Sequence, residues 1–114
     1  MSYIDEQVAE IAAGQALSAA VPLGEKTLVG ILVPANWSAA SLTFQASADD
    51  VNFFELVDGA GNPMSFTVAA GQIIAVDPTK WRGITNVKIR SGTSASPVNQ
   101  TAAVALTLIT RTVY

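Results

Sequence analysis

One stretch of this 114-residue chain, residues 41–57, constrains the fold more than any other. Apolar Leu42 and Phe44 alternate with polar neighbours such as Thr43, and this period of two is typical of a strand buried on one face. The Asp49-Asp50 pair then predicts a tight turn, because short carboxylates bond to nearby backbone N–H groups and tolerate unusual φ values. An apolar run returns the chain as a second strand. The stretch therefore predicts a central β-hairpin.

Further strands are predicted along most of the chain, with turn residues about every 8–12 positions. Residues 27–33 are apolar and largely β-branched, which is typical of a strand covered on both faces, and Gly30 within them indicates a bulge or a close backbone approach. The other strands are expected at 15–22, 65–68, 72–76, 86–90 and 101–112. Residues 80–85 are expected to form a loop or a single helical turn, and residues 91–100 a loop. About eight strands predict an all-β fold, a jelly-roll-like two-sheet β-sandwich over residues 15–114.

The first 14 residues differ from the rest. Ile4, Val8 and Ile11 recur at i, i+4 and i+7, a spacing that places them on one face of a helix. A helix this short is marginal on its own, so it would need a surface on which to dock. The segment is therefore predicted to be a short amphipathic helix or an arm, and these three side chains are expected to contact a partner.

Composition excludes several classes of function. The formal net charge is −3, so the chain lacks the basic surplus that binds nucleic acid. It contains neither Cys nor His, which removes disulfides, thiolate metal sites and the commonest general base. No apolar run reaches the roughly 18 residues that cross a membrane, and the acidic N-terminus is unlike a signal peptide. We therefore expect no enzyme, no cofactor, and no nucleic-acid or membrane partner.

The charged residues are few and unevenly placed. They make up 13% of the chain, against the roughly 25% that is usual, which is typical of a surface partly covered in an assembly. A compact monomer with few charges is the alternative. Four of the six basic residues lie within residues 80–90. Lys88 and Arg90 are expected to share an outward strand face and to contact an acidic partner, unless that face is simply solvated.

Two other groups of residues have competing interpretations. Asp49, Asp50 and Asn52 gather oxygen ligands in one turn, but a calcium loop needs more ligands at fixed spacing, so turn capping is favoured and no metal is predicted. Two tryptophans sit in loops beside strands. Trp37 is assigned to the core, whereas Trp81 is equally suited to the core and to a partner contact.

Three blocks of sequence resemble small proteins from tailed-phage and prophage structural gene clusters, and the resemblance spans residues 12–111. The blocks are Leu28-Val29-Gly30-Ile31 with Pro34-Ala35-Asn36-Trp37, then Leu42-Thr43-Phe44-Gln45-Ala46-Ser47-Ala48-Asp49, and finally Val87-Lys88-Ile89-Arg90-Ser91-Gly92-Thr93 with Pro97-Val98-Asn99-Gln100. The last block is the most specific, whereas the Ser-x-Asp turn alone also resembles galactose-binding-like jelly rolls. Such relatives often have Asp-Gly where this chain has Asp49-Asp50, so a different turn type is expected.

The resemblance implies a virion protein, made in the host cytoplasm, of the capsid decoration or cement type. Proteins of this type usually sit as homotrimers on the capsid surface and bridge subunits of the major capsid protein. Together with the N-terminal residues and the basic strand, the expected contacts are Ser91, Thr93, Asn99, Gln100 and Trp81. Two alternatives remain open, a carbohydrate-binding module for host adsorption and a head–tail connector or tail subunit.

Overall fold

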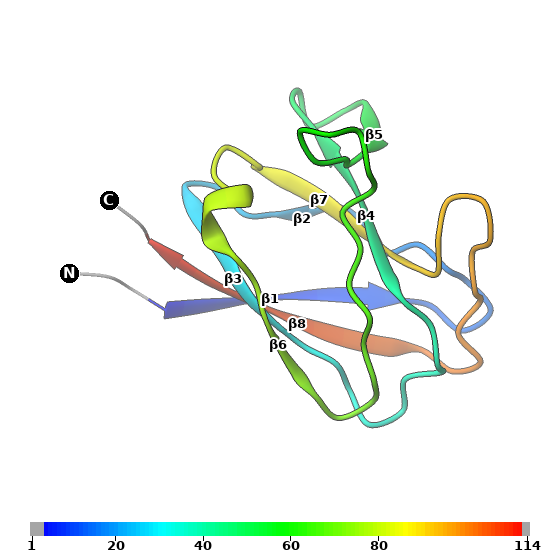
Figure 1. Cartoon of the computed structure of the whole chain (residues 1–114). Coiled ribbons are helices and arrows are strands. Elements are labelled where there is room, and N and C mark those ends of the chain that lie inside the picture. The colour runs from blue at the N-terminus through cyan, green and yellow to red at the C-terminus, as the bar shows by residue number, and fades with distance from the viewer. Residues whose placement is uncertain (1–3, 113–114) are drawn as a thin grey trace.

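The computed structural model describes residues 4–112, which form eight strands and one turn of 3-10 helix (Figure 1). The elements are β1 (Ile4–Ile11), β2 (Val21–Pro22), β3 (Lys26–Leu32), β4 (Leu42–Ser47), β5 (Phe53–Glu55), β6 (Ile73–Ala75), η1 (Pro78–Lys80), β7 (Asn86–Ser91) and β8 (Val104–Thr112). The strands make two antiparallel four-stranded sheets, so the predicted all-β sandwich is confirmed. Within residues 4–112, no helix has the length and apolarity that spanning a membrane requires.

The strands pair in a nested order. Sheet 1 has the order β1-β8-β3-β6, and sheet 2 has the order β2-β7-β4-β5. Each strand of the first half of the chain is therefore bonded to one of the second half: β1 to β8, β2 to β7, β3 to β6 and β4 to β5. The hairpin predicted within residues 41–57 is the β4–β5 pair, and it lies at the centre of this nesting.

The N-terminal segment is a strand, so the predicted arm or helix is wrong for residues 4–11. It pairs with β8 along its whole length, from Ile4 opposite Arg111 to Ile11 opposite Val104. Ala9 and Ile11 are fully buried while Val8 is 54% exposed, which is the period of a strand. Pairing with β8 supplies the backbone hydrogen bonds and burial that so short a helix would lack. Residues 1–3 of the predicted arm lie outside the described residues.

The apolar core lies between the inner faces of the two sheets. Its largest members include Ile11, Leu28, Ile31, Leu42, Phe44, Ile89, Leu106 and Leu108, all with no exposed surface. An aromatic cluster closes one side of it: the Phe44 ring meets Trp81 edge to face at 5.0 Å between centroids and Phe66 at 5.6 Å. Trp37 is also buried, as predicted, and for Trp81 the structure decides in favour of the core.

Gly30 lies at a close approach within sheet 1, as the sequence predicts. The register of β3 against β8 shifts between Leu28 and Gly30, which marks a bulge. A Cβ atom on Gly30 would lie 3.3 Å from the backbone oxygen of Ile74 and 3.4 Å from Cδ1 of Ile109. The absence of a side chain therefore lets β6 and β8 pack tightly on both sides of β3.

Two predicted strands are reduced to a residue pair or a single bridge. Of residues 15–22, only Val21–Pro22 form a strand, because the Ser18 hydroxyl accepts the Ile89 N–H at 2.9 Å and so interrupts the ladder with β7. Of residues 65–68, only Phe66 makes a bridge, to Leu42. Both segments follow sheet 2 without completing a regular strand.

Candidate interaction surfaces

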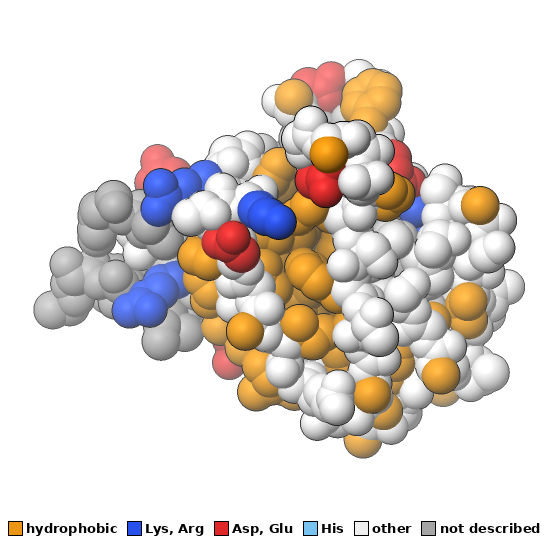
Figure 2. Space-filling model, viewed as in Figure 1, with side chains coloured by type: hydrophobic (Ala, Val, Ile, Leu, Met, Phe, Trp, Pro, Cys, Tyr) orange, Lys and Arg blue, Asp and Glu red, His pale blue; other side chains and the backbone are white. Residues whose placement is uncertain are grey.

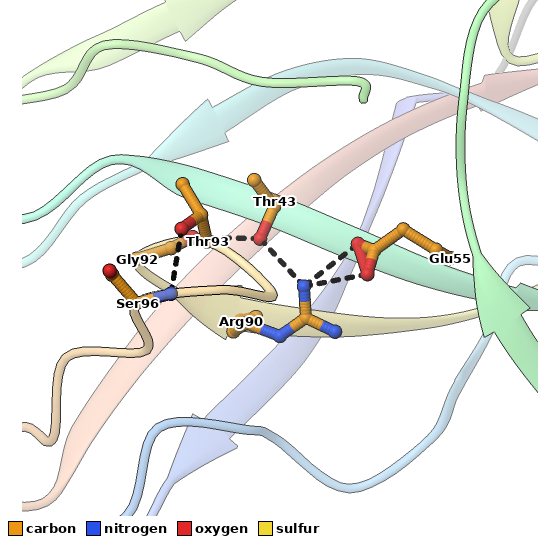
Figure 3. Close-up of polar contacts among 6 residues, drawn as sticks. All are labelled: Thr43, Glu55, Arg90, Gly92, Thr93 and Ser96. Atoms are coloured by element: carbon orange, nitrogen blue, oxygen red, sulfur yellow. Dashed lines mark hydrogen bonds and ion pairs between the residues drawn. The ribbon is translucent and has the colours of Figure 1, made fainter. Parts of the chain in front are cut away.

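The Arg90 side chain is held in an ion pair on the outer face of sheet 2 (Figure 3). Its Nη1 lies 2.7 Å and 2.8 Å from the two carboxylate oxygens of Glu55 and donates to Thr43 Oγ1 at 3.2 Å. Thr43 lies opposite Arg90 in the ladder, and β4 separates β7 from β5, so the pair ties three strands together. Arg90 is only 7% exposed. It is therefore a buried, paired residue and not the free basic group that the sequence predicts.

Gln100 holds the base of the loop at residues 91–100. Its side chain has no exposed surface and bridges two segments. Its Nε2 donates to Ser91 Oγ at 2.8 Å and to the Ser38 carbonyl at 3.1 Å, while its Oε1 accepts the Ser38 N–H at 2.8 Å. Ser91 is fully buried as well. Both residues were expected to contact a partner, and the structure gives them an internal role because every polar atom of the amide is used within the chain.

Gly92 shapes the start of the same loop. Its φ is +88°, and a Cβ atom would lie 2.5 Å from the Ser96 carbonyl oxygen, so only glycine fits. The carbonyl of Gly92 accepts the Thr43 hydroxyl at 2.7 Å (Figure 3). Thr93 Oγ1 accepts the Ser96 N–H at 3.0 Å, which closes the tip. Of the contact residues predicted in this loop, Thr93 and Asn99 are exposed, as are residues 94–98 between them.

The β4–β5 turn is organised by one carboxylate. Asp49 Oδ1 accepts the N–H groups of Asn52 at 2.8 Å and Val51 at 3.0 Å, and these bonds hold the pKa of Asp49 well below its usual range. The next residue, Asp50, has φ = +64°, the conformation that glycine favours. Asp50 therefore takes the glycine-like backbone conformation of an Asp-Gly pair, contrary to the expected change of turn. Asp49 caps the turn as the sequence predicts, whereas the Asp50 side chain makes no hydrogen bond within residues 4–112.

Exposed aliphatic side chains lie in two rows on the outer face of sheet 1, with Glu6 and Glu10 of β1 on either side of Val8. The cross-strand register places Val8, Thr107, Leu32 and Ile73 in one row over β1, β8, β3 and β6. Val8 is 54%, Leu32 37% and Ile73 66% exposed. The neighbouring row adds Ile109 and Ala75. We call the set Val8, Leu32, Ile73, Ala75 and Ile109 the apolar face.

A cleft opens on the side of the sandwich where β5 and β6 form the sheet edges. A cavity of about 190 Å³ is lined by Met64, Phe66 and Trp81, with Asp58, Asp77 and Lys80 around them. A second cavity of about 200 Å³ shares Asp58, Met64 and Lys80 with the first. Figure 2 shows hydrophobic atoms in a hollow of this side, with acidic and basic side chains at its rim. We call these two cavities together the open-side cleft.

The acidic groups of the open-side cleft are anionic at neutral pH. Asp58 Oδ1 accepts the N–H groups of Asn62 and Ala60, and these bonds lower the pKa of Asp58. Asp77 Oδ1 accepts the hydroxyl and N–H of Thr79, which lowers the pKa of Asp77 in the same way. In residues 4–112, no three Asp or Glu side chains are grouped as a metal site. The cleft therefore offers fixed charges around an apolar floor.

The predicted contact residues do not form one surface. Ile11, Trp81, Arg90, Ser91 and Gln100 are buried. Val8 points outward from sheet 1, whereas Lys88 is half-buried on sheet 2, with its ammonium 4.6 Å from the centre of the Phe53 ring. The side chain of Ile4 lies outside the described residues.

Sequence reasoning missed most of the apolar face and all of the cleft lining except Trp81. Ile73 and Ile74 are identical in type, so the strand at residues 72–76 gives no sign of which side chain faces outward. Met64 and Lys80 come from segments on either side of β6, and only folding brings them together.

Comparison with known proteins assigns the chain to no family. No protein-family model, no curated protein and no solved structure matches it.

Proposed function

We propose that this chain is a capsid decoration protein of a tailed phage, which binds the outside of the capsid through the apolar face of sheet 1. The observation that carries the proposal is the row of exposed aliphatic side chains from β1, β3 and β6. Exposed aliphatic side chains gathered on one sheet face favour a contact with another protein. The partner that we propose is the major capsid protein, whose subunits the decoration protein would bridge.

The strand pairing supports a jelly roll, the finer architecture that we propose for the sandwich. The pairs β1–β8, β2–β7, β3–β6 and β4–β5 are those obtained when one long antiparallel hairpin folds over into two sheets. Jelly rolls of two four-stranded sheets are common in viral capsid domains. The proposed architecture is thus consistent with a virion protein.

A homotrimer is the proposed assembly on the shell. The low fraction of charged residues, 13%, favours a chain with much of its surface covered by partners. A trimer would bind the shell through three weak contacts at once. After the first contact forms, the high effective concentration of the other two raises the overall affinity for the shell.

The carbohydrate-binding alternative has lost its main support. A sugar ring stacks only on an exposed aromatic side chain, and both tryptophans are buried: Trp37, which the sequence assigns to the core, is 6% exposed, and Trp81, which it leaves open, is 1% exposed. No specific observation favours a head–tail connector. The decoration function therefore remains the single function that we propose.

Co-sedimentation with capsid shells assembled without the protein tests the proposal. Wild type should bind at a fixed copy number per shell. Ile73→Lys places a charge at the most exposed large aliphatic position of the apolar face, on its edge strand β6, and should weaken binding by about tenfold or more, because the charge loses water in the contact. Val51→Lys makes the same kind of change at a 76% exposed position in the β4–β5 turn, so it is the control and should bind normally.

Two results would overturn the proposal. If wild type does not bind shells, the decoration function is wrong. If Ile73→Lys binds as wild type does, the protein meets the shell through a surface other than the apolar face.

A further inference from the structure

We propose that the open-side cleft receives an extended segment of another polypeptide, which adds as a strand beside residues 64–68. An apolar side chain of that segment would enter the cleft, and a flanking Lys or Arg would meet the acidic groups at the rim. The inference does not depend on the capsid function, because it needs neither a shell nor a trimer.

The backbone of residues 64–68 is open to an added strand. Phe66 exchanges both of its backbone hydrogen bonds with Leu42, each at 3.0 Å. In an antiparallel pair the bonding direction alternates along the strand, so the N–H and C=O groups of Ser65 and Thr67 face away from β4. Neither residue makes a backbone hydrogen bond to any residue in the range 4–112, and both are exposed. A second extended chain can take these free groups.

Residues 64–68 carry none of the sequence features that commonly block such pairing. Native sheets protect their edges with charged residues, proline or bulges. Strand β1, the opposite edge of the sandwich, carries Asp5, Glu6 and Glu10. Residues 64–68, by contrast, are Met-Ser-Phe-Thr-Val and contain neither a charge nor a proline. Residues 64–68 therefore lack the charge and the proline that commonly protect an edge.

The cleft has the size and lining for side chains of a peptide. Its cavities, about 190 Å³ and 200 Å³, are each smaller than the roughly 300 Å³ at which pockets for small organic ligands begin. Phe66 and Trp81 both belong to the edge-to-face cluster around Phe44, so the floor is already ordered. The space therefore suits one or two aliphatic side chains and needs little rearrangement to accept them.

The charges at the rim favour a basic segment. Asp58 and Asp77 each use Oδ1 within their own turn, and in residues 4–112 neither Oδ2 accepts a hydrogen bond. Lys80 is the one cation lining the cavities. The lining of the two cavities thus holds two carboxylates and one ammonium, and Arg82 acts on Asp77 from outside the lining. The free Oδ2 atoms of this lining are complementary to Lys or Arg beside the apolar anchor.

Amide hydrogen exchange with a synthetic peptide tests the proposal. The probe is acetyl-Lys-Val-Lys-Leu-Lys-amide, in which Val and Leu point to one face of an extended chain. Binding of this basic peptide should slow amide exchange at Ser65 and Thr67. The acidic counterpart, acetyl-Glu-Val-Glu-Leu-Glu-amide, should bind with an affinity lower by about fivefold or more. If the basic peptide leaves the exchange at both residues unchanged, the proposal is wrong.

Matched variants separate strand addition from attraction by charge alone. Thr67→Pro removes an N–H that is unused in the free protein, so the fold should survive, but peptide binding should fall about tenfold. Thr67→Ser keeps the N–H and should bind normally. Lys80→Gln leaves the backbone groups of residues 64–68 unchanged and removes a positive charge that repels the basic peptide, so it should raise the affinity for that peptide about threefold. Equal binding by the Pro and Ser variants would overturn strand addition. A shell-binding failure in the earlier assay would leave these results unaffected.

Discussion

Arg90 and Glu55 form one ion pair, but they differ in how far water can reach each side chain once the other is removed. The side chain of Arg90 is 9% exposed, whereas that of Glu55 is 29% exposed. A buried charge that loses its counter-ion is costly, because neither water nor another group compensates it. A half-exposed carboxylate can regain water. The two residues of one ion pair should therefore respond unequally to substitution.

Glu55→Gln should destabilise the protein more than Arg90→Met does. We expect Glu55→Gln to lower the free energy of unfolding by about 2–3 kcal/mol, and Arg90→Met by about 1 kcal/mol. Urea denaturation of the two variants measures the difference. Asp5→Asn, which breaks the exposed pair with Lys26, is the control and should have a much smaller effect. A larger loss for Arg90→Met would contradict the burial argument.

Strand β1 illustrates how an element takes its form from its partner. Ile4, Val8 and Ile11 have helical spacing, yet Ala9 and Ile11 face the core and Val8 faces outward. Ala9 lies opposite Leu106 of β8, and this place in the ladder makes its small side chain part of the core. The sequence of β1 alone is compatible with either period, and β8 selects the strand.

Lysine substitutions at adjacent positions of β1 test the strand period. Ala9→Lys forces a charge into the core and should cost about 3 kcal/mol or more, whereas Val8→Lys should cost less than about 0.5 kcal/mol. Thermal and urea unfolding of both variants give the comparison. An amphipathic helix with Val8 on its docked face would give the reverse order, so that order would contradict the strand.

The whole molecule carries a set of aspartates whose pKa values are lowered by hydrogen bonds. Asp5, Asp49, Asp58 and Asp77 all behave in this way, each in a different loop or strand. Each folded pKa lies below the ordinary value of 3.8, so folding favours the ionised form. The contribution of these four carboxylates to the free energy of unfolding is therefore complete at a pH above 3.8, and it is lost as the pH falls through their lower pKa values in the folded state.

The free energy of unfolding should stay nearly constant from pH 7 to about pH 5 and decrease below about pH 4. The chain has no His, which would otherwise titrate between these limits. Asp49→Asn should make the decrease below pH 4 shallower, because its side chain no longer binds a proton on unfolding. Urea midpoints at a series of pH values measure this. Asp50→Asn, whose side chain makes no hydrogen bond in residues 4–112, is the control; equal slopes for both variants would contradict the assignment.

By itself the sequence determined the all-β sandwich, the central hairpin, the bulge at Gly30 and the capping role of Asp49. These features depend on alternation, turn chemistry and the steric freedom of glycine, which are properties of neighbouring residues. Only the tertiary structure decided that β1 is a strand, that Arg90 and Gln100 are internal, and that an apolar face and a cleft exist. Each of these depends on residues far apart in the chain, such as Glu55 beside Arg90 and Ser38 beside Gln100, and local pattern does not encode such distant contacts.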